Sequence, residues 1–199
     1  MTDFKMTKNG LRSQQNVLAQ LQTYLPTLQL KKTLLQVEVN QSKIKLEKLN
    51  ENFYKKKDEV TSFSDLLTDK YHLSPLNFTK IRNVTRNYEN IAGIEIPVFQ
   101  KVIFEDSDYF LFDTPIWFDT VIEKIKETLI VKEKIVIEEE KKRALEKELI
   151  DVSIRVNLFE KILIPRTNRN IKKIKIFLSD QELALISQAK IAKLKKEKK

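Results

Sequence analysis

The chain has 199 residues, of which 33% are charged, and its 37 lysines and arginines outnumber its 28 acidic residues. It contains two glycines and five prolines, which favours long helices over a globule rich in loops. Because cysteine is absent, a disulfide framework and a thiolate metal site are excluded, and a reducing compartment suits the chain. We expect neither a signal peptide nor a membrane span, since no stretch of about 18 apolar residues occurs.

The net charge of +9 is concentrated near the C-terminus. Residues 161–199 carry 12 lysines and arginines against 3 acidic residues, whereas residues 1–160 have 25 of each sign. Residues 1–32 are also basic, with five lysines and arginines against Asp3. If the chain folds back on itself, the two basic ends meet and favour an acidic partner, whether nucleic acid, anionic lipid or protein.

A heptad pattern predicts one long N-terminal helix from about Thr7 to Leu67. Of seventeen positions stepped alternately by three and four residues, thirteen are apolar, and a 3.5-residue repeat of this length needs a partner helix. Pro26 lies inside the stretch, and because the heptad phase continues beyond it, we expect a kink there and not a helix end. The seventeen positions are Leu11, Gln14, Leu18, Leu21, Leu25, Leu28, Lys32, Leu35, Val39, Ser42, Leu46, Leu49, Phe53, Lys56, Val60, Phe63 and Leu67.

Residues 68–113 are predicted to form a small middle module. Ser74–Pro75 is typical of a helix start, and an apolar face with Gly93 as its stop predicts a short helix over residues 76–91. The alternating run over residues 94–104 predicts a β-hairpin that turns at residues 105–108 and returns over 109–112. Pro97 implies an edge position or a partner strand that does not need its missing N–H. The face of the predicted short helix comprises Leu76, Ile81, Val84, Tyr88 and Ile91.

A second long helix is predicted over residues 114–199, opening at Thr114–Pro115. Within it, the run Glu138–Glu140, followed at once by three cations, is interpreted as a solvated face. Pro165 interrupts the apolar heptads, which continue in a shifted phase, and the lysine-rich end is expected to fray. The apolar positions are Trp117, Val121, Ile125, Leu129, Leu145, Leu149, Val152, Val156, Phe159, Leu163, Ile171, Ile174, Leu178 and Leu185.

The predicted fold class is mainly α: a long antiparallel two-helix coiled coil formed by the N- and C-terminal helices. The middle module, a short helix plus a β-hairpin, lies at one end, and both termini lie at the other. The domains are residues 1–67, 68–113 and 114–199. A rod of this kind has a mechanical or connective function unless a site shows otherwise.

The sequence contains no recognisable active site. His72 is the single histidine and is interpreted as structural or surface-exposed, and no Ser/His/Asp or Cys/His set is possible beyond that one imidazole. Two isolated glycines cannot build a phosphate-binding loop. We therefore expect no catalytic, cofactor-binding or metal-binding residues. Clustered C-terminal lysines are the one argument for nucleic-acid binding, which lacks interleaved aromatic residues and any known motif and is the less favoured interpretation.

Four segments in chain order carry a family resemblance. They are Thr7–Lys8 with Leu18, Leu21 and residues 30–35 (LKKTLL), residues 90–98 (NIAGIEIPV), residues 109–114 with Asp119, and, most specific, residues 155–166 (RVNLFEKILIPR). Together they resemble the D subunit of the V-type and archaeal A-type rotary ATPases, especially its shorter prokaryotic members. Three positions depart from the family pattern, since Ile154 replaces an arginine, Leu158 an alanine and Pro26 a glycine. These departures imply a locally different contour and no change of role.

The resemblance implies the central rotor shaft of such an ATPase, a non-catalytic subunit that couples ATP hydrolysis or synthesis to ion translocation. The implied partners are the catalytic and regulatory A and B subunits, the F subunit, and the funnel-shaped C/d subunit above the membrane ring. The implied location is cytoplasmic, in the soluble V1/A1 sector peripheral to the membrane, with neither nucleic acid nor direct membrane insertion. Neither the coupling ion, H⁺ or Na⁺, nor the working direction is encoded in these residues.

Candidate contact residues follow from the motifs. Kinks near Pro26 and Pro165 would make the shaft asymmetric, and the lysines and arginines over residues 161–175 either face acidic loops of surrounding subunits or only keep the tip soluble. Shaft contacts are assigned to Thr7, Lys8, Pro26, Arg155, Asn157, Pro165, Arg166, Lys172, Lys173 and Lys175. Middle-module contacts, toward the F subunit, are assigned to Gly93, Ile96, Pro97, Phe104 and Tyr109.

The alternative function is a structural coiled-coil tether or scaffold without any ATPase. It shares the two long helices with the rotor interpretation. It does not account for the segments over residues 90–98 and 155–166.

Overall fold

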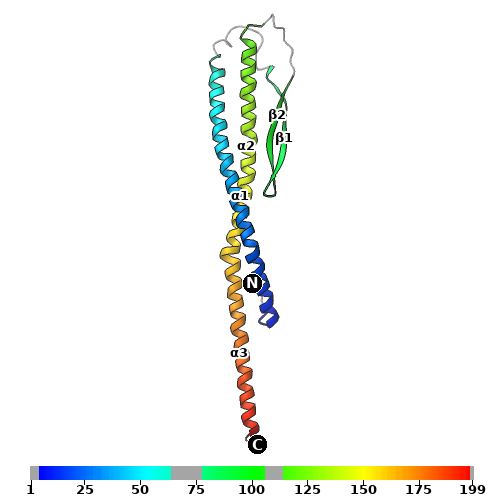
Figure 1. The fold of residues 1–199 in the computed structure, drawn as a ribbon, viewed down its shortest axis with the longest axis vertical. Helices are drawn as coiled ribbons and strands as arrows, with labels where there is room; N and C mark the ends of the chain where they lie inside the picture. Colours follow the sequence, from blue (N-terminus) through cyan, green and yellow to red (C-terminus); the bar gives the residue numbers. More distant parts are fainter. Residues whose placement is uncertain (1–4, 64–77, 106–113, 198–199) are drawn as a thin grey trace. The chain divides into compact units, whose positions relative to one another are not determined.

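The computed structural model describes residues 5–63, 78–105 and 114–197 and is mainly helical, with one two-stranded antiparallel sheet in that part of the chain (Figure 1). The chain divides into two compact units. Unit 1 comprises Met1–Lys32 and Asp151–Lys199, and unit 2 comprises Thr33–Ile150. The elements are α1 (Lys8–Thr61), β1 (Ile81–Ile91), β2 (Ile94–Phe104), α2 (Phe118–Leu158), the π-helix η4 (Phe159–Leu163) and α3 (Ile164–Glu197).

The heptad seam predicted for the N-terminal helix is confirmed in α1. Every predicted seam position from Leu11 to Phe63 is buried or half-buried, whereas most positions between them are exposed. The helix runs through Pro26 without ending, as predicted. It stops at Thr61 and not at Leu67, because Ser62 and Phe63 already form a turn. Residues 64–67 lie outside the described part.

Both units pair their helices in the predicted antiparallel sense. In unit 2 the Nζ atoms of Lys43, Lys45 and Lys56 form ion pairs with the carboxylates of Glu146, Glu138 and Glu127, respectively. The residue numbers on α2 therefore decrease as those on α1 increase. In unit 1, Lys8 lies 3.9 Å from Glu182 and Gln14 accepts a 3.5 Å hydrogen bond from Asn170. The seam is therefore closed by a partner helix within the same chain.

The second long helical region begins later than predicted, and its last stretch is exposed. The helix α2 opens at Phe118, whose N–H donates to the carbonyl of Pro115, so a turn through Ile116 and Trp117 precedes the helix and Thr114–Pro115 lies before it. In α3 every described side chain from Ser179 to Lys196 is exposed, including Leu185, which the heptad pattern assigns to the apolar face. The helix α1 begins at Lys8, beside Glu182, so it offers no residues to cover this last stretch.

The short helix predicted over residues 76–91 is wrong where the structure describes it. Residues Ile81–Ile91 form the strand β1, which pairs with β2 from Ile81 opposite Phe104 to Ile91 opposite Ile94. The hairpin therefore turns at Ala92–Gly93 and not at residues 105–108, and the predicted return strand over 109–112 lies outside the described residues. Pro97 stands on an edge strand, as predicted, because both strands of a two-stranded sheet are edges.

The turn residues explain why this hairpin forms. Ala92 and Gly93 both have positive φ values, 53° and 86°, which is the type I′ geometry that suits a two-residue connection between twisted strands. The Asn90 side chain accepts a 2.9 Å hydrogen bond from the Gly93 N–H and fixes the turn. Gly93 thus does adopt the left-handed conformation expected from the sequence, in a hairpin instead of a helix end.

The shifted phase beyond Pro165 has a structural cause. Up to Phe159, successive buried or half-buried positions on this face are spaced alternately by four and three residues. The next three, Leu163, Thr167 and Ile171, are each four residues apart. This sequence of steps contains one extra residue relative to the heptad. The π-helix η4 absorbs it, since the Ile164 N–H donates to the carbonyl of Phe159, five residues earlier. The apolar face therefore remains turned toward the interior of unit 1 on both sides of Pro165.

The two turn residues should respond oppositely to substitution. A Cβ at position 93 would meet nothing within 4 Å, so Gly93→Ala should destabilise the hairpin through backbone strain alone, by about 1 kcal/mol. Ala92→Gly relieves the same strain and should be neutral or stabilising by up to about 1 kcal/mol. Amide hydrogen exchange over β1 and β2 measures both, and equal losses of protection would contradict the turn assignment.

Candidate interaction surfaces of the two units

The described residues form neither a cluster of metal ligands nor a membrane-spanning helix. No group of three or more histidine, cysteine, aspartate or glutamate side chains there could hold a metal ion. None of the described helices has a stretch apolar enough to cross a bilayer. His72 lies outside the described residues.

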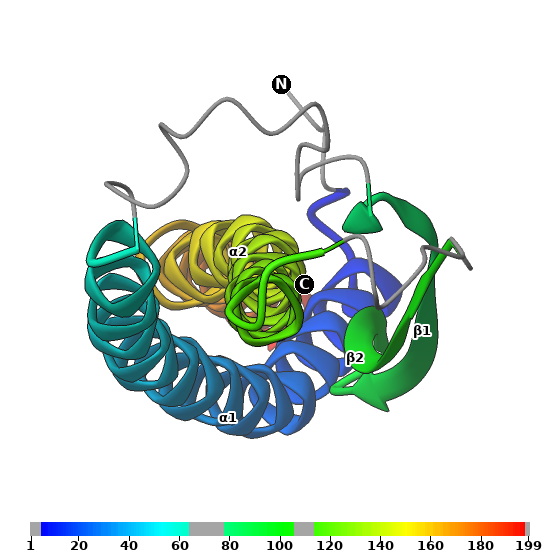
Figure 2. The same cartoon turned by 90° about the horizontal axis from the view of Figure 1, so that it is seen from above.

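In unit 2 the β-hairpin contacts α2 through two cation–π interactions and one ion pair. Lys126 lies 5.5 Å from the ring centroid of Phe104, and Lys134 lies 5.2 Å from that of Phe99. On β1, Arg86 donates a 2.7 Å bond to Glu140. Figure 2 shows the two strands beside α2 when unit 2 is seen along its helices. The hairpin is thus a fixed part of unit 2.

The proposed middle-module residues have different environments. Ile96 is completely buried, so it packs in the interior of unit 2 and presents no surface to a partner. Pro97 and Phe104 are half-buried, whereas Gly93 at the turn is exposed. Tyr109 lies outside the described residues. Sequence reasoning missed the exposed Tyr88, 63% of whose surface is accessible, because its segment was assigned to a helix.

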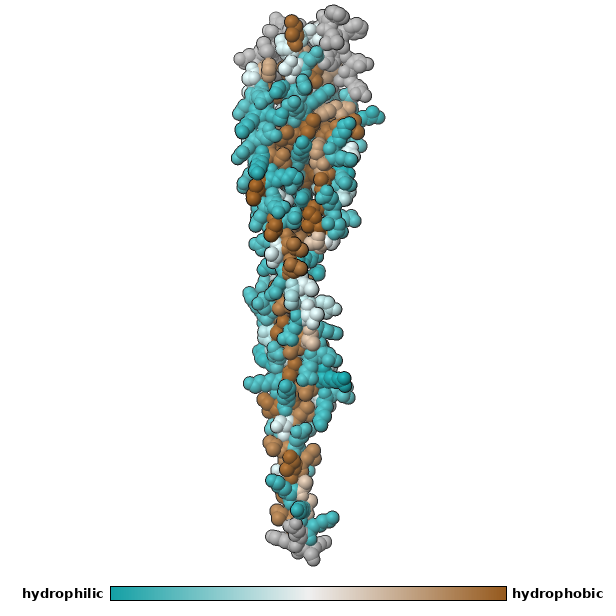
Figure 3. All heavy atoms as spheres, in the orientation of Figure 1, coloured by the Kyte–Doolittle hydropathy of each residue, from teal (hydrophilic) through white to brown (hydrophobic). Residues whose placement is uncertain are grey.

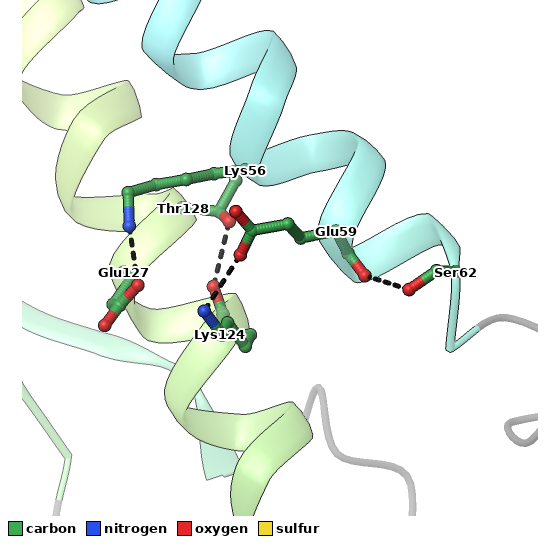
Figure 4. A network of polar contacts seen from close by, with 6 residues as sticks. All are labelled: Lys56, Glu59, Ser62, Lys124, Glu127 and Thr128. Carbon is green, nitrogen blue, oxygen red and sulfur yellow. Dashed lines mark hydrogen bonds and ion pairs between the residues drawn. The ribbon is translucent and has the colours of Figure 1, made fainter.

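A network of four charges joins the last turns of α1 to the first turns of α2 (Figure 4). Lys124 donates to Glu59 at 2.8 Å, and Lys56 donates to Glu127 at 2.5 Å. The hydrogen bond from Lys124 lowers the pKa of the Glu59 carboxyl and raises the pKa of Lys124 itself. The bond from Lys56 lowers the pKa of Glu127 in the same way. These pairs favour the ionised form of both carboxylates and link the two helix ends.

Glu138 contradicts the solvated-face interpretation of its charged run. It is buried to 95%, and its Oε2 accepts a 2.7 Å bond from Lys45, while its Oε1 has no partner in the described structure. Beside it is a cavity of about 280 Å³ where α1, α2 and β2 meet, lined by Lys45, Leu49, Val98, Phe99, Lys134, Ile137 and Glu138. The neighbours Glu139 and Glu140 are exposed, so the solvated-face interpretation holds for them.

Unit 1 exposes most of the residues that the sequence assigned to shaft contacts. Thr7 caps α1, since its Oγ1 accepts a 3.1 Å bond from the Gly10 N–H. Pro165, the second residue of α3, is half-buried. The predicted shaft-contact residues with exposed side chains are Thr7, Lys8, Pro26, Arg155, Asn157, Arg166, Lys172, Lys173 and Lys175. The π-helix was missed, although the three consecutive steps of four were a readable signal for it.

The buried pair makes a prediction about stability. Lys45→Met leaves the Glu138 carboxylate buried without its cation and should cost about 1–3 kcal/mol of unfolding free energy. Glu138→Leu should cost little or stabilise, because Lys45, whose side chain is 59% exposed, can turn to water.

A double-mutant cycle in urea unfolding checks this coupling. In the Glu138→Leu background, Lys45→Met should have almost no further effect. An equal cost of Lys45→Met in both backgrounds would mean that the two side chains do not interact energetically.

Comparison with known proteins places these units in a family. A family model for the D subunit of ATP synthase matches residues 10–194. The V-type ATP synthase D subunit of Chlamydia caviae is 44% identical over 195 residues, which cover 98% of this chain and 94% of that protein. The protein of the same name from Chlamydia trachomatis serovar L2 is 41% identical over 197 residues, covering 98% and 96%. The chain therefore belongs to the family of ATP synthase D subunits and is a component of a V-type ATP synthase.

Proposed function

We propose that this chain is the central shaft of a V-type rotary ATP synthase and couples nucleotide chemistry to ion translocation without a catalytic residue of its own. The observation that carries the proposal is family membership over nearly the whole chain. The antiparallel pairing in both units supports it, because a shaft that transmits torque needs helices that resist bending and unwinding.

A shaft can act on catalytic sites through differential contact alone. If it is asymmetric and enclosed by a pseudo-threefold ring, it contacts the three catalytic sites differently. Each nucleotide state then favours one shaft angle, and turning the shaft shifts the populations of the site conformations. The shaft itself needs exposed side chains of defined chemistry and an interior that holds them in place.

The proposed partners divide between the two units. Unit 1, with Lys8, Arg155 and Lys172 among its exposed residues, contacts the A and B subunits of the catalytic hexamer. The hairpin of unit 2 contacts the F subunit, and the chain docks on the funnel-shaped C/d subunit. The complex that results is the V1 sector, peripheral to the membrane.

Affinity capture of the tagged chain at moderate salt tests the assembly. The catalytic, regulatory and F subunits should be recovered, with about one tagged chain per hexamer, and mass spectrometry measures the ratio. Recovery of the chain without these partners would favour the alternative, a coiled-coil scaffold unconnected with an ATPase. A variant shortened after Leu178 serves as a control, because it keeps the buried seam of unit 1 and loses only the stretch of α3 that is exposed throughout.

The two prolines within the helices of unit 1 give a second prediction. Pro26 lies inside α1 and Pro165 is the second residue of α3, so each removes a backbone donor from a helical ladder. If they give the shaft its asymmetry, replacing both with alanine should alter rotational pausing or coupling in the assembled complex. Single-molecule rotation of the double variant measures this, and pausing and torque like those of the original chain would remove the prolines from the mechanism.

A further inference from the structure

The surplus positive charge of the chain belongs to unit 1. Its residues include 18 lysines and arginines and 6 acidic residues, whereas unit 2 has 19 and 22. Between Glu160 and Asp180 the sequence contains six cations and no acidic residue. We call these six the basic strip: Lys161, Arg166, Arg169, Lys172, Lys173 and Lys175.

The basic strip occupies the outward side of its helical segment. All six side chains are exposed. The buried residues of the same segment are Thr167, Ile171 and Ile174, spaced by four and three so that they share the opposite face. The exposed Ile162, Ile176 and Phe177 lie among the cations, a mixture of charge and apolar surface that suits a protein surface better than a phosphate backbone.

A stretch of the other helix of unit 1, between Arg12 and Lys31, has the contrary composition. From Ser13 to Leu30 the sequence contains no charged residue, in a chain that is 33% charged. The outward side of this stretch carries exposed, uncharged side chains, among them Asn16, Gln20, Thr23 and Thr27. We call this the neutral face. The hydrogen bond between Gln14 and Asn170 places the start of the neutral face alongside the basic strip in one helix pair.

Hydropathy alone does not reveal this division. Figure 3 shows hydrophilic surface on both helices with brown side chains interspersed, because glutamine, asparagine and lysine are all hydrophilic on that scale. Charge separates the two sides where polarity does not. An acidic surface attracts the basic strip at contact range, and salt screens exposed charges beyond about 8 Å at physiological ionic strength. The neutral face therefore makes no comparable ion pairs.

We propose that the basic strip binds an acidic protein surface of the enclosing catalytic ring and, because the neutral face cannot do so, fixes the preferred angle of the shaft. This inference rests on the proposed function. One-sided ion pairing favours those angles at which the strip meets acidic groups. The neutral face passes the same groups without ion pairs to break. The angle preference thus comes from where the charge lies and not from how much there is.

The test compares variants of equal net charge in the complex reconstituted from the catalytic hexamer and the full chain. The neutralised variant carries Lys172→Gln, Lys173→Gln and Lys175→Gln. The transplanted variant adds Asn16→Lys, Gln20→Lys and Thr23→Lys, which restores the net charge of the original chain on the opposite side. All six substitutions are at exposed positions and introduce good helix formers, so both variants should fold, which circular dichroism checks.

Affinity for the hexamer should fall roughly 3- to 150-fold at low salt in the neutralised variant, three exposed ion pairs being lost. The transplanted variant should remain weakened, and its resting angles in single-molecule rotation should be shifted or broadened. Wild-type affinity and angles in the transplanted variant would overturn the proposal, since total charge would then suffice. Tighter binding of the wild-type strip to DNA than to the hexamer would overturn it as well. Failure of the unaltered chain to enter the hexamer would instead contradict the proposed function.

Discussion

The apolar seam of α1 is the constraint on which the rest of the molecule depends. A stripe repeating every 3.5 residues cannot be buried by its own helix, and an isolated helix with such a stripe is unstable in water. The chain supplies the cover itself, by α2 in unit 2 and by the region from Asp151 onward in unit 1. Because the seam decides which side of each helix is covered, it also decides which side remains available to partners.

The long-range period was predictable from sequence, whereas the middle module was not. The heptad repeat extends over sixteen consecutive positions, so it predicts the helix despite local exceptions such as Ser42. Residues Ile81–Ile91 form a short segment whose pattern is compatible with the period of a helix and with that of a strand. The helix was predicted because Ile81, Val84, Tyr88 and Ile91 are spaced as on one helical face. Pairing with β2 and the Asn90-Ala92-Gly93 turn favoured the strand, which is tertiary context overriding a local pattern.

The candidate contact residues were predicted in part, and for different reasons. Exposed cations of α3 could be read from composition, because charged residues without opposite charges nearby are rarely buried. Ile96 and Glu138 could not be placed in this way. Ile96 belongs to the recognised motif and yet is buried, and Glu138 belongs to a charged run and yet is buried against Lys45. Whether such residues are covered depends on where the hairpin lies along α2, which no local pattern specifies.

Covering the seam in unit 1 required an adjustment that bears on function. One extra residue after Phe159 would turn the following apolar positions about 100° away from α1 in a regular helix. The π-helix η4 takes up this rotation, and Thr167, Ile171 and Ile174 remain buried. The same adjustment turns the basic strip outward, since its cations lie opposite those three residues. Had the phase error persisted, cations would have been rotated toward the seam, where their desolvation opposes helix pairing. On the proposed function, charge spread evenly around the axis of the shaft could not distinguish three equivalent sites by electrostatics, however large that charge is. The π-helix η4 keeps the six cations of the basic strip together on the outward side of their own helix, which is the uneven distribution that the proposal requires.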